Sequence, residues 1–163
     1  MLFKTLAATT AFVCSVAAAA QAEDGLVTAK KPAGMVIAML NAGYDAELTA
    51  DDVGDPLINS QVAGYPLQIF FYDCDEETHT ECGSIQLVAG FDRATPWTAE
   101  AAIKVSNDYR FAAVSLDDEG DPYLRWDIVT DEGIPTRVFV KSLRRFEDTV
   151  RLAEDLIFAD QPE

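Results

Sequence analysis

The sequence has little of what catalytic and metal sites usually need. His79 is its only histidine, and Cys14, Cys74 and Cys82 are its only cysteines. A hydrolytic triad would need His79 as its base, and no serine lies in a G-x-S-x-G context. The sequence also lacks a P-loop, a dinucleotide-binding fingerprint and an H-E-x-x-H motif. We therefore predict no catalytic residues, no cofactor and no metal site, and we expect a protein that is not an enzyme.

Basic residues are scarce as well. The chain has 12 Lys and Arg residues against 28 Asp and Glu residues, which gives a formal net charge of −16. Such a surface repels phosphate backbones and anionic lipid head groups, so we expect no nucleic-acid partner and no membrane surface as a partner. A cationic partner or a metal ion is compatible with this charge. High negative charge is also explained by solubility alone.

Long hydrophobic runs are absent beyond the N-terminus, and the N-terminal run has the layout of a secretory signal peptide. Lys4 supplies the positive region, residues 6–20 supply the apolar region, and Ala20, Gln21 and Ala22 form a small-x-small cleavage site. A retained membrane anchor is the alternative, but the run is short and no basic stop-transfer residues follow it. We expect cleavage after Ala22 and a periplasmic or secreted protein with no membrane attachment after cleavage.

The remaining chain has the length of one domain with a sizeable core. We predict a signal peptide over residues 1–22, an N-terminal linker over 23–31 and a single domain over 32–160. Its hydrophobic periodicity predicts an α+β fold, in which helices pack on a twisted antiparallel sheet of about six strands. The expected order is helix 32–43, strands 44–50, 56–62, 67–74 and 84–91, a short helix after Thr98, strands 110–116 and 123–129, and a long helix 137–157.

The strand at 67–74 is the most hydrophobic part of this domain. Its sequence LQIFFYDC predicts a strand that is covered on both faces, with the strand at 84–91 beside it at the centre of the sheet. The long C-terminal helix is the clearest element, because its apolar residues recur every three or four positions. This stripe predicts a seam against the sheet, with a partner-binding face as the alternative. The stripe consists of Phe139, Leu143, Phe146, Val150, Ala153 and Ile157.

Five basic residues lie on the same helix of an otherwise acidic protein. We expect them to hold acidic neighbours rather than to bind phosphate. They are Arg137, Lys141, Arg144, Arg145 and Arg151.

Cys74 and Cys82 flank a short acidic loop between the two central strands. In an oxidising compartment such a pair is expected to form a disulfide. The alternative is a zinc site in which His79 joins the two cysteines, with Asp75 or Glu81 as the fourth ligand. A redox-active pair is less expected, because thiol-exchange enzymes favour C-x-x-C spacing.

Two acidic stretches look alike: DDVGDPLI begins at Asp51, and DDEGDPYL begins at Asp117. The second fails the EF-hand pattern, because its glycine comes at position 4 and Ile128 occupies position 12. Asp at the start, Gly where φ turns positive and Pro at the returning strand are typical of hairpin turns. We predict two hairpin turns, with weak cation sites as the alternative.

Three parts of the chain together resemble the YbjN family, described as bacterial sensory transduction regulators. They are the run AGMVIAMLNAGYDAEL, the run SNDYRFAAVSLDDEGDPYLRWDI and the closing amphipathic helix. The resemblance covers roughly residues 30 to 159. It implies an α+β domain similar to type III secretion chaperones and a role without catalysis, and no catalytic residues carry over from the family. The signal peptide and the cysteine-flanked loop depart from the commoner members.

These observations predict an exported, non-catalytic, chaperone-like or regulatory module that binds another protein or a second copy of itself. An acidic protein of the envelope that binds calcium or another metal is the alternative. A small hydrolase that uses paired carboxylates is less expected, because no cleft-forming insertion is evident.

Overall fold

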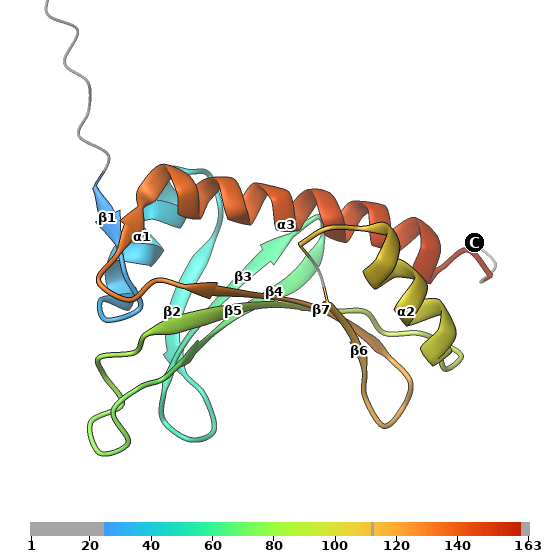
Figure 1. Cartoon of the computed structure of the whole chain (residues 1–163), viewed down its shortest axis with the longest axis horizontal. Helices are drawn as coiled ribbons and strands as arrows, with labels where there is room; N and C mark the ends of the chain where they lie inside the picture. The colour runs from blue at the N-terminus through green and yellow to red at the C-terminus, as the bar shows by residue number, and fades with distance from the viewer. Residues whose placement is uncertain (1–24, 112, 161–163) are drawn as a thin grey trace, which may run out of the picture.

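The computed structural model describes residues 25–111 and 113–160. Within them the chain forms three helices and eight strands of an α+β fold, as predicted (Figure 1). The predicted signal peptide and its cleavage after Ala22 lie outside the described residues. No helix of the described part combines the length and apolarity that crossing a membrane requires. The elements are β1 (Leu26–Val27), α1 (Pro32–Asn41), β2 (Ala46–Ala50), β3 (Pro56–Val62), β4 (Tyr65–Tyr72), β5 (Ser84–Gly90), α2 (Ala99–Asp108), β6 (Ala113–Leu116), β7 (Pro122–Val129), β8 (Ile134–Pro135) and α3 (Thr136–Ile157).

Six strands form one antiparallel sheet in the order β2-β3-β4-β5-β7-β6. The most hydrophobic strands, β4 and β5, are its central pair, as the sequence predicts. Their register places Phe71 opposite Ile85, and the next pair of strands places Leu87 opposite Trp126. β2 and β6 are the two edge strands, and each pairs with only one neighbour within the sheet.

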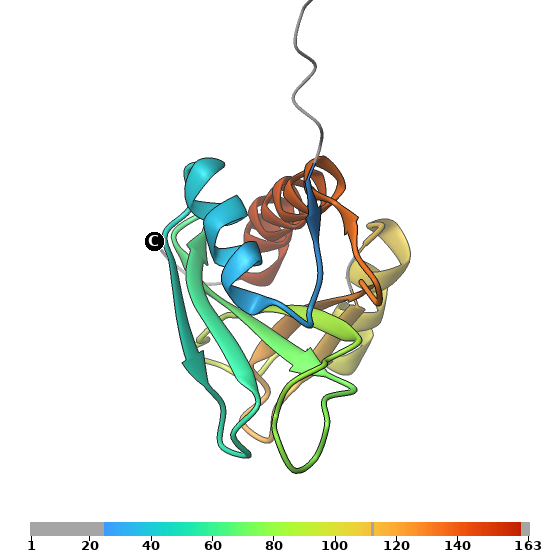
Figure 2. The same cartoon turned by 90° about the vertical axis from the view of Figure 1, so that its left-hand side faces the viewer.

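The helices α1 and α3 lie on the same side of this sheet (Figures 1 and 2). Along β4, Leu67, Ile69 and Phe71 face these helices and are buried, whereas Phe70 is half-buried and Tyr72 is exposed on the opposite face. The prediction that this strand is covered on both faces is therefore wrong. Its continuous apolar run arises because aromatic residues also occupy the outer face, which no helix of the described chain covers.

The apolar stripe of α3 forms the seam against the sheet, as predicted. All six of its residues are fully buried in one core cluster with α1 and the inner face of the sheet. At about 1.5–3 kcal/mol for each large apolar side chain removed from water, this stripe is a major source of stability. The start of α2 is also as predicted, because the Thr98 side chain accepts a hydrogen bond from the Ala101 N–H and caps the helix.

The segment 23–31, predicted to be a linker, contains a strand of the fold, β1. β1 pairs with β8, and Val27 and Ala29 are buried in the core. The Ala29 N–H donates to Thr130 Oγ1 at 2.9 Å, which fixes this segment to the turn after β7. Two strands of two residues each are too short to show the alternation on which strand prediction depends.

Candidate functional site

The two acidic stretches are hairpin turns, as predicted. Asp51 Oδ1 accepts hydrogen bonds from the N–H groups of Val53, Gly54 and Asp55 at 2.9–3.0 Å, in the turn between β2 and β3. Asp117 plays the same part between β6 and β7, where its Oδ1 accepts from the N–H groups two and four residues later. In both turns the leading carboxylate is thus occupied by the chain itself. Among the described residues, no three His, Cys, Asp or Glu side chains come together as a metal site would require.

The loop between β4 and β5 brings the sulfur atoms of Cys74 and Cys82 to 2.11 Å from each other. His79 does not join them. Its Nδ1 lies 2.8 Å from Asp55 Oδ1, so the imidazole connects this loop to the turn between β2 and β3. The arrangement required by the zinc alternative, with His79 beside both cysteines, is not formed. The structure thus uses this histidine as a contact between two acidic loops.

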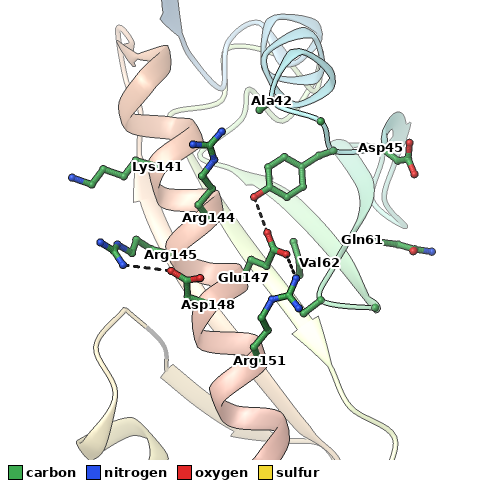
Figure 3. A pocket seen from close by; sticks show the side chains of 14 residues that line it. Ala42, Asp45, Gln61, Val62, Lys141, Arg144, Arg145, Glu147, Asp148 and Arg151 are labelled. Carbon is green, nitrogen blue, oxygen red and sulfur yellow. Dashed lines mark hydrogen bonds and ion pairs between the residues drawn. The ribbon is translucent and has the colours of Figure 1, made fainter.

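Two hollows lie on either side of α3, and its basic residues stand between them. The first has a volume of about 730 Å³ and is bounded by α3, the connection from α1 to β2 and the turn from β3 to β4 (Figure 3). Small residues form its far rim, where Gly43 and Gly64 both have positive φ and open space at their α-carbons. These glycines leave the hollow open toward solvent.

The centre of the first hollow is the carboxylate of Glu147. It accepts hydrogen bonds from Arg151 at 2.5 Å and from the Tyr44 hydroxyl at 3.0 Å, and a third from the Ala63 N–H. The Arg151 hydrogen bond is the main cause that holds the Glu147 pKa below its usual range, with Tyr44 contributing. Burial, together with the hydrogen bond to Glu147, raises the pKa of Tyr44 to about 12. Glu147 therefore joins three separate segments, and its oxygens have little capacity left for a ligand.

Four of the five basic residues of α3 divide into two groups. Arg145 pairs with Asp148 at 3.4 Å and Arg151 with Glu147, so the expectation that they hold acidic neighbours is met at these two positions. Lys141 and Arg144 form no ion pair with any described residue. Figure 3 shows that Lys141 and Arg145 point away from Glu147, toward the other side of α3. Both side chains line the first hollow and the second, so their positive charge borders both.

The second hollow, which we call the α3 groove, lies on that other side and has a volume of about 590 Å³. Its floor is apolar. The ring of Phe111 stacks on that of Trp126 with centroids 4.9 Å apart, and the Phe111 side chain remains 45% exposed. Val138 and Leu152 of α3 also line the groove and are exposed. An open aromatic pair with two exposed aliphatic side chains beside it is a surface that binding of a partner would cover.

Three cations border this floor. They are Arg110, whose guanidinium lies 4.8 Å from the centroid of the Phe111 ring, together with Lys141 and Arg145. Arg110, like Lys141, forms no ion pair with any described residue. The groove therefore combines an apolar floor with a basic rim in a chain whose net charge is −16. The Ser142 hydroxyl and the Asp148 carboxylate also line the groove. The exposed apolar floor and the excess of cations suit an anionic, partly apolar partner.

Sequence reasoning missed this groove. Residues 110–116 were expected to be one strand, but β6 begins at Ala113 and Phe111 has a φ of +66°. This left-handed backbone turns the ring out of the strand and onto Trp126. The exposed Val138 and Leu152 lie off the buried stripe of α3, roughly four helical turns apart. Their spacing was the available signal, but it does not reveal which segment faces them.

Comparison with protein families gives one match, to the family model YbjN, over residues 35–158. That family is described as "Putative bacterial sensory transduction regulator". The match extends from within α1 to the residue after α3, and so includes both hollows. A comparison with curated proteins found no match.

Proposed function

The chain belongs to the YbjN family, and from this premise we propose that it is an exported, non-catalytic regulatory module that binds another protein through the α3 groove. The family description supports the regulatory role. The N-terminal sequence supports export, because residues 1–22 have the three regions of a cleavable signal peptide.

A single observation carries the proposal. In a chain with more than twice as many acidic as basic residues, three cations surround an exposed apolar floor. Lone surface cations are common, but here Lys141 and Arg110 have no acidic partner among the described residues and stand beside exposed Phe111 and Leu152. Protein interfaces place such aromatic and arginine side chains at their centres.

The carboxyl groups support a role without catalysis. General acids in carboxylate-dependent hydrolases need a raised pKa. In the described part of the chain, the displaced carboxyl pKa values of Asp75, Glu132, Glu147 and Asp160 are all lowered, chiefly by hydrogen bonds. Each of these groups is therefore held as a carboxylate in a structural contact.

Site-specific photocrosslinking tests the proposal. A benzophenone amino acid is placed at Val138, on the groove, or at Val53, in the turn between β2 and β3, where the side chain is 70% exposed. The full chain is produced in the cells that make it naturally, and the cells are illuminated. We expect a discrete adduct with another protein from Val138 and none from Val53. Equal adducts from both positions, no adduct, or an adduct of twice the chain's own mass would contradict the proposal.

A further inference from the structure

The chemistry of the α3 groove specifies the kind of segment that it accepts, an inference that rests on the proposed function. We infer that the groove binds one acidic segment of a partner protein, and that this segment carries an aromatic or long aliphatic anchor residue. The anchor lies on the floor between Phe111 and Leu152. Carboxylates on either side of it pair with Arg110, Lys141 and Arg145.

The exposed apolar side chains of the groove floor favour a partner segment with an apolar anchor residue. Phe111, Val138 and Leu152 have exposed fractions of 45%, 39% and 49%, and Trp126, on which Phe111 stacks, packs against the buried core. The Phe111 ring is held by its stacking on Trp126 and by the left-handed backbone at its own position. A side chain that enters from solvent meets a surface already in place, so little ordering of the groove opposes binding.

The cations at the rim of the groove favour a partner segment that carries carboxylates. Arg110 and Lys141 have no ion-pair partner among the described residues. Arg145 shares its charge with Asp148 at 3.4 Å, and both side chains are more than half exposed, so this pair is weak and exchanges readily for another carboxylate. A basic segment would be drawn to the acidic remainder of the surface but repelled at this rim. Charge complementarity therefore selects an acidic segment here.

The dimensions favour a protein segment over a small anion. Val138 and Leu152 stand at the two ends of the α3 side of the groove, roughly four turns apart, or about 21 Å along a helix. Lys141 and Arg145 lie between them on the same side of the groove. A short amphipathic segment can contact the apolar ends and the basic middle together, as in helix-in-groove recognition. A polyphosphate or lipid head group would meet the cations but would leave the apolar ends uncovered.

Peptide selection tests this inference without knowledge of the natural partner. The probe is a phage-displayed library of random peptides of about 16 residues, long enough to span the groove as a helix, selected on the purified chain. Enriched peptides are synthesised with a fluorescent label, and their dissociation constants are measured by anisotropy. We expect enrichment of acidic peptides with Phe, Trp or Leu near the centre.

Matched variants locate the binding. Leu152→Asp and the double variant Lys141→Glu with Arg145→Glu should each weaken binding at least about tenfold, because each removes the contacts that hold the anchor or its carboxylates. Val53→Asp and Lys104→Glu carry the same kinds of change on exposed side chains outside the groove, and should leave binding unchanged. Circular dichroism checks that all variants fold. Failure to enrich peptides, enrichment of basic peptides, or unchanged binding by Leu152→Asp would overturn the inference.

Photocrosslinking and peptide selection distinguish failure of the proposed function from failure of the inferred anchor. A partner crosslinked from Val138, with selected peptides that are indifferent to Leu152, leaves the proposed function standing and rejects the anchor. Selected peptides that need Leu152, with no crosslinked protein in cells, reject the proposed function and leave the groove as a peptide-binding surface.

Discussion

The Tyr44 hydroxyl donates a hydrogen bond of 3.0 Å to the Glu147 carboxylate, and this contact joins the connection between α1 and β2 to the middle of α3 across 103 positions of the chain. Arg151 and the Ala63 N–H also donate hydrogen bonds to the same carboxylate. The Glu147 contacts in the first hollow therefore hold separate segments of the fold together, and the α3 groove on the other side of the helix is the surface at which we propose that a partner binds.

Replacement of Tyr44 by Phe should lower the free energy of unfolding by about 1–2 kcal/mol, because a hydrogen bond to a charged group is lost. Urea denaturation at neutral pH measures this loss. Tyr72→Phe, at an exposed tyrosine on the open face of the sheet, is the matched control and should change stability by less than about 0.5 kcal/mol.

The same contact predicts a pH dependence. The pKa of Tyr44 is raised from 10.0 to about 12 in the folded chain, so its contribution to stability is complete below pH 10 and is lost as pH rises toward 12. The difference in stability between the wild-type chain and Tyr44→Phe should therefore shrink above pH 10. A difference that stays constant to pH 11 would show that the hydroxyl does not make this hydrogen bond.

Oxidation of Cys74 and Cys82 should stabilise the chain. For a ring with a sequence separation of 8, chain entropy predicts about 2.5 kcal/mol. The unreduced protein should have a mass two hydrogens below that of the reduced protein, and Cys74→Ser with Cys82→Ser should unfold at lower urea. Two free thiols in protein isolated from an oxidising compartment would reject the disulfide.

Asp160 should be needed to neutralise a buried cation. The Arg93 side chain is fully buried, and its guanidinium donates to both Asp160 oxygens at 2.8 and 3.1 Å. Asp160→Asn should cost about 1–3 kcal/mol, because the buried charge loses its partner. Adding Arg93→Met to this variant should recover part of the loss in urea denaturation. If Arg93→Met lowers the free energy of unfolding further, Arg93 stabilises the chain mainly through its hydrogen bond to the Thr95 carbonyl oxygen.

Export should produce a chain that begins at Glu23. Mass spectrometry of the protein from the periplasm or the medium measures this end directly. Ala20→Leu with Ala22→Leu should block cleavage, because bulky residues do not fit a small-x-small site. Full-length protein in the cytoplasm, from the unaltered sequence, would contradict both the signal peptide and the proposed export.

Local patterns predicted much of the fold. The spacing of Phe139, Leu143 and Phe146 indicated which face of α3 is buried, because helical periodicity depends only on neighbouring turns. The Asp, Gly and Pro residues of the two acidic stretches indicated hairpins, because turn geometry is also local. Because the turn before it is defined by local residues, the strand expected at 56–62 begins and ends where β3 does.

The Glu147 contacts and the groove could not be predicted in this way. Glu147 meets Tyr44 and Ala63 only after the sheet has formed, and nothing in its own helix distinguishes it from other exposed acids. Likewise, Phe111 reaches Trp126 because Phe111 itself adopts a left-handed backbone within the strand expected at 110–116. Such contacts depend on which distant segments pack together, and periodicity reports only which face of each segment is apolar.

The central claim is that a partner protein occupies the α3 groove through its basic rim. The most direct test is the yield of the crosslinked adduct from a benzophenone at Val138, measured in cells. The variant Lys141→Glu with Arg145→Glu should lower this yield about tenfold, the effect of 1.4 kcal/mol in affinity. The control Lys31→Glu with Lys104→Glu, which changes the net charge equally outside the groove, should leave the yield unchanged. Equal yields from both double variants would contradict the account.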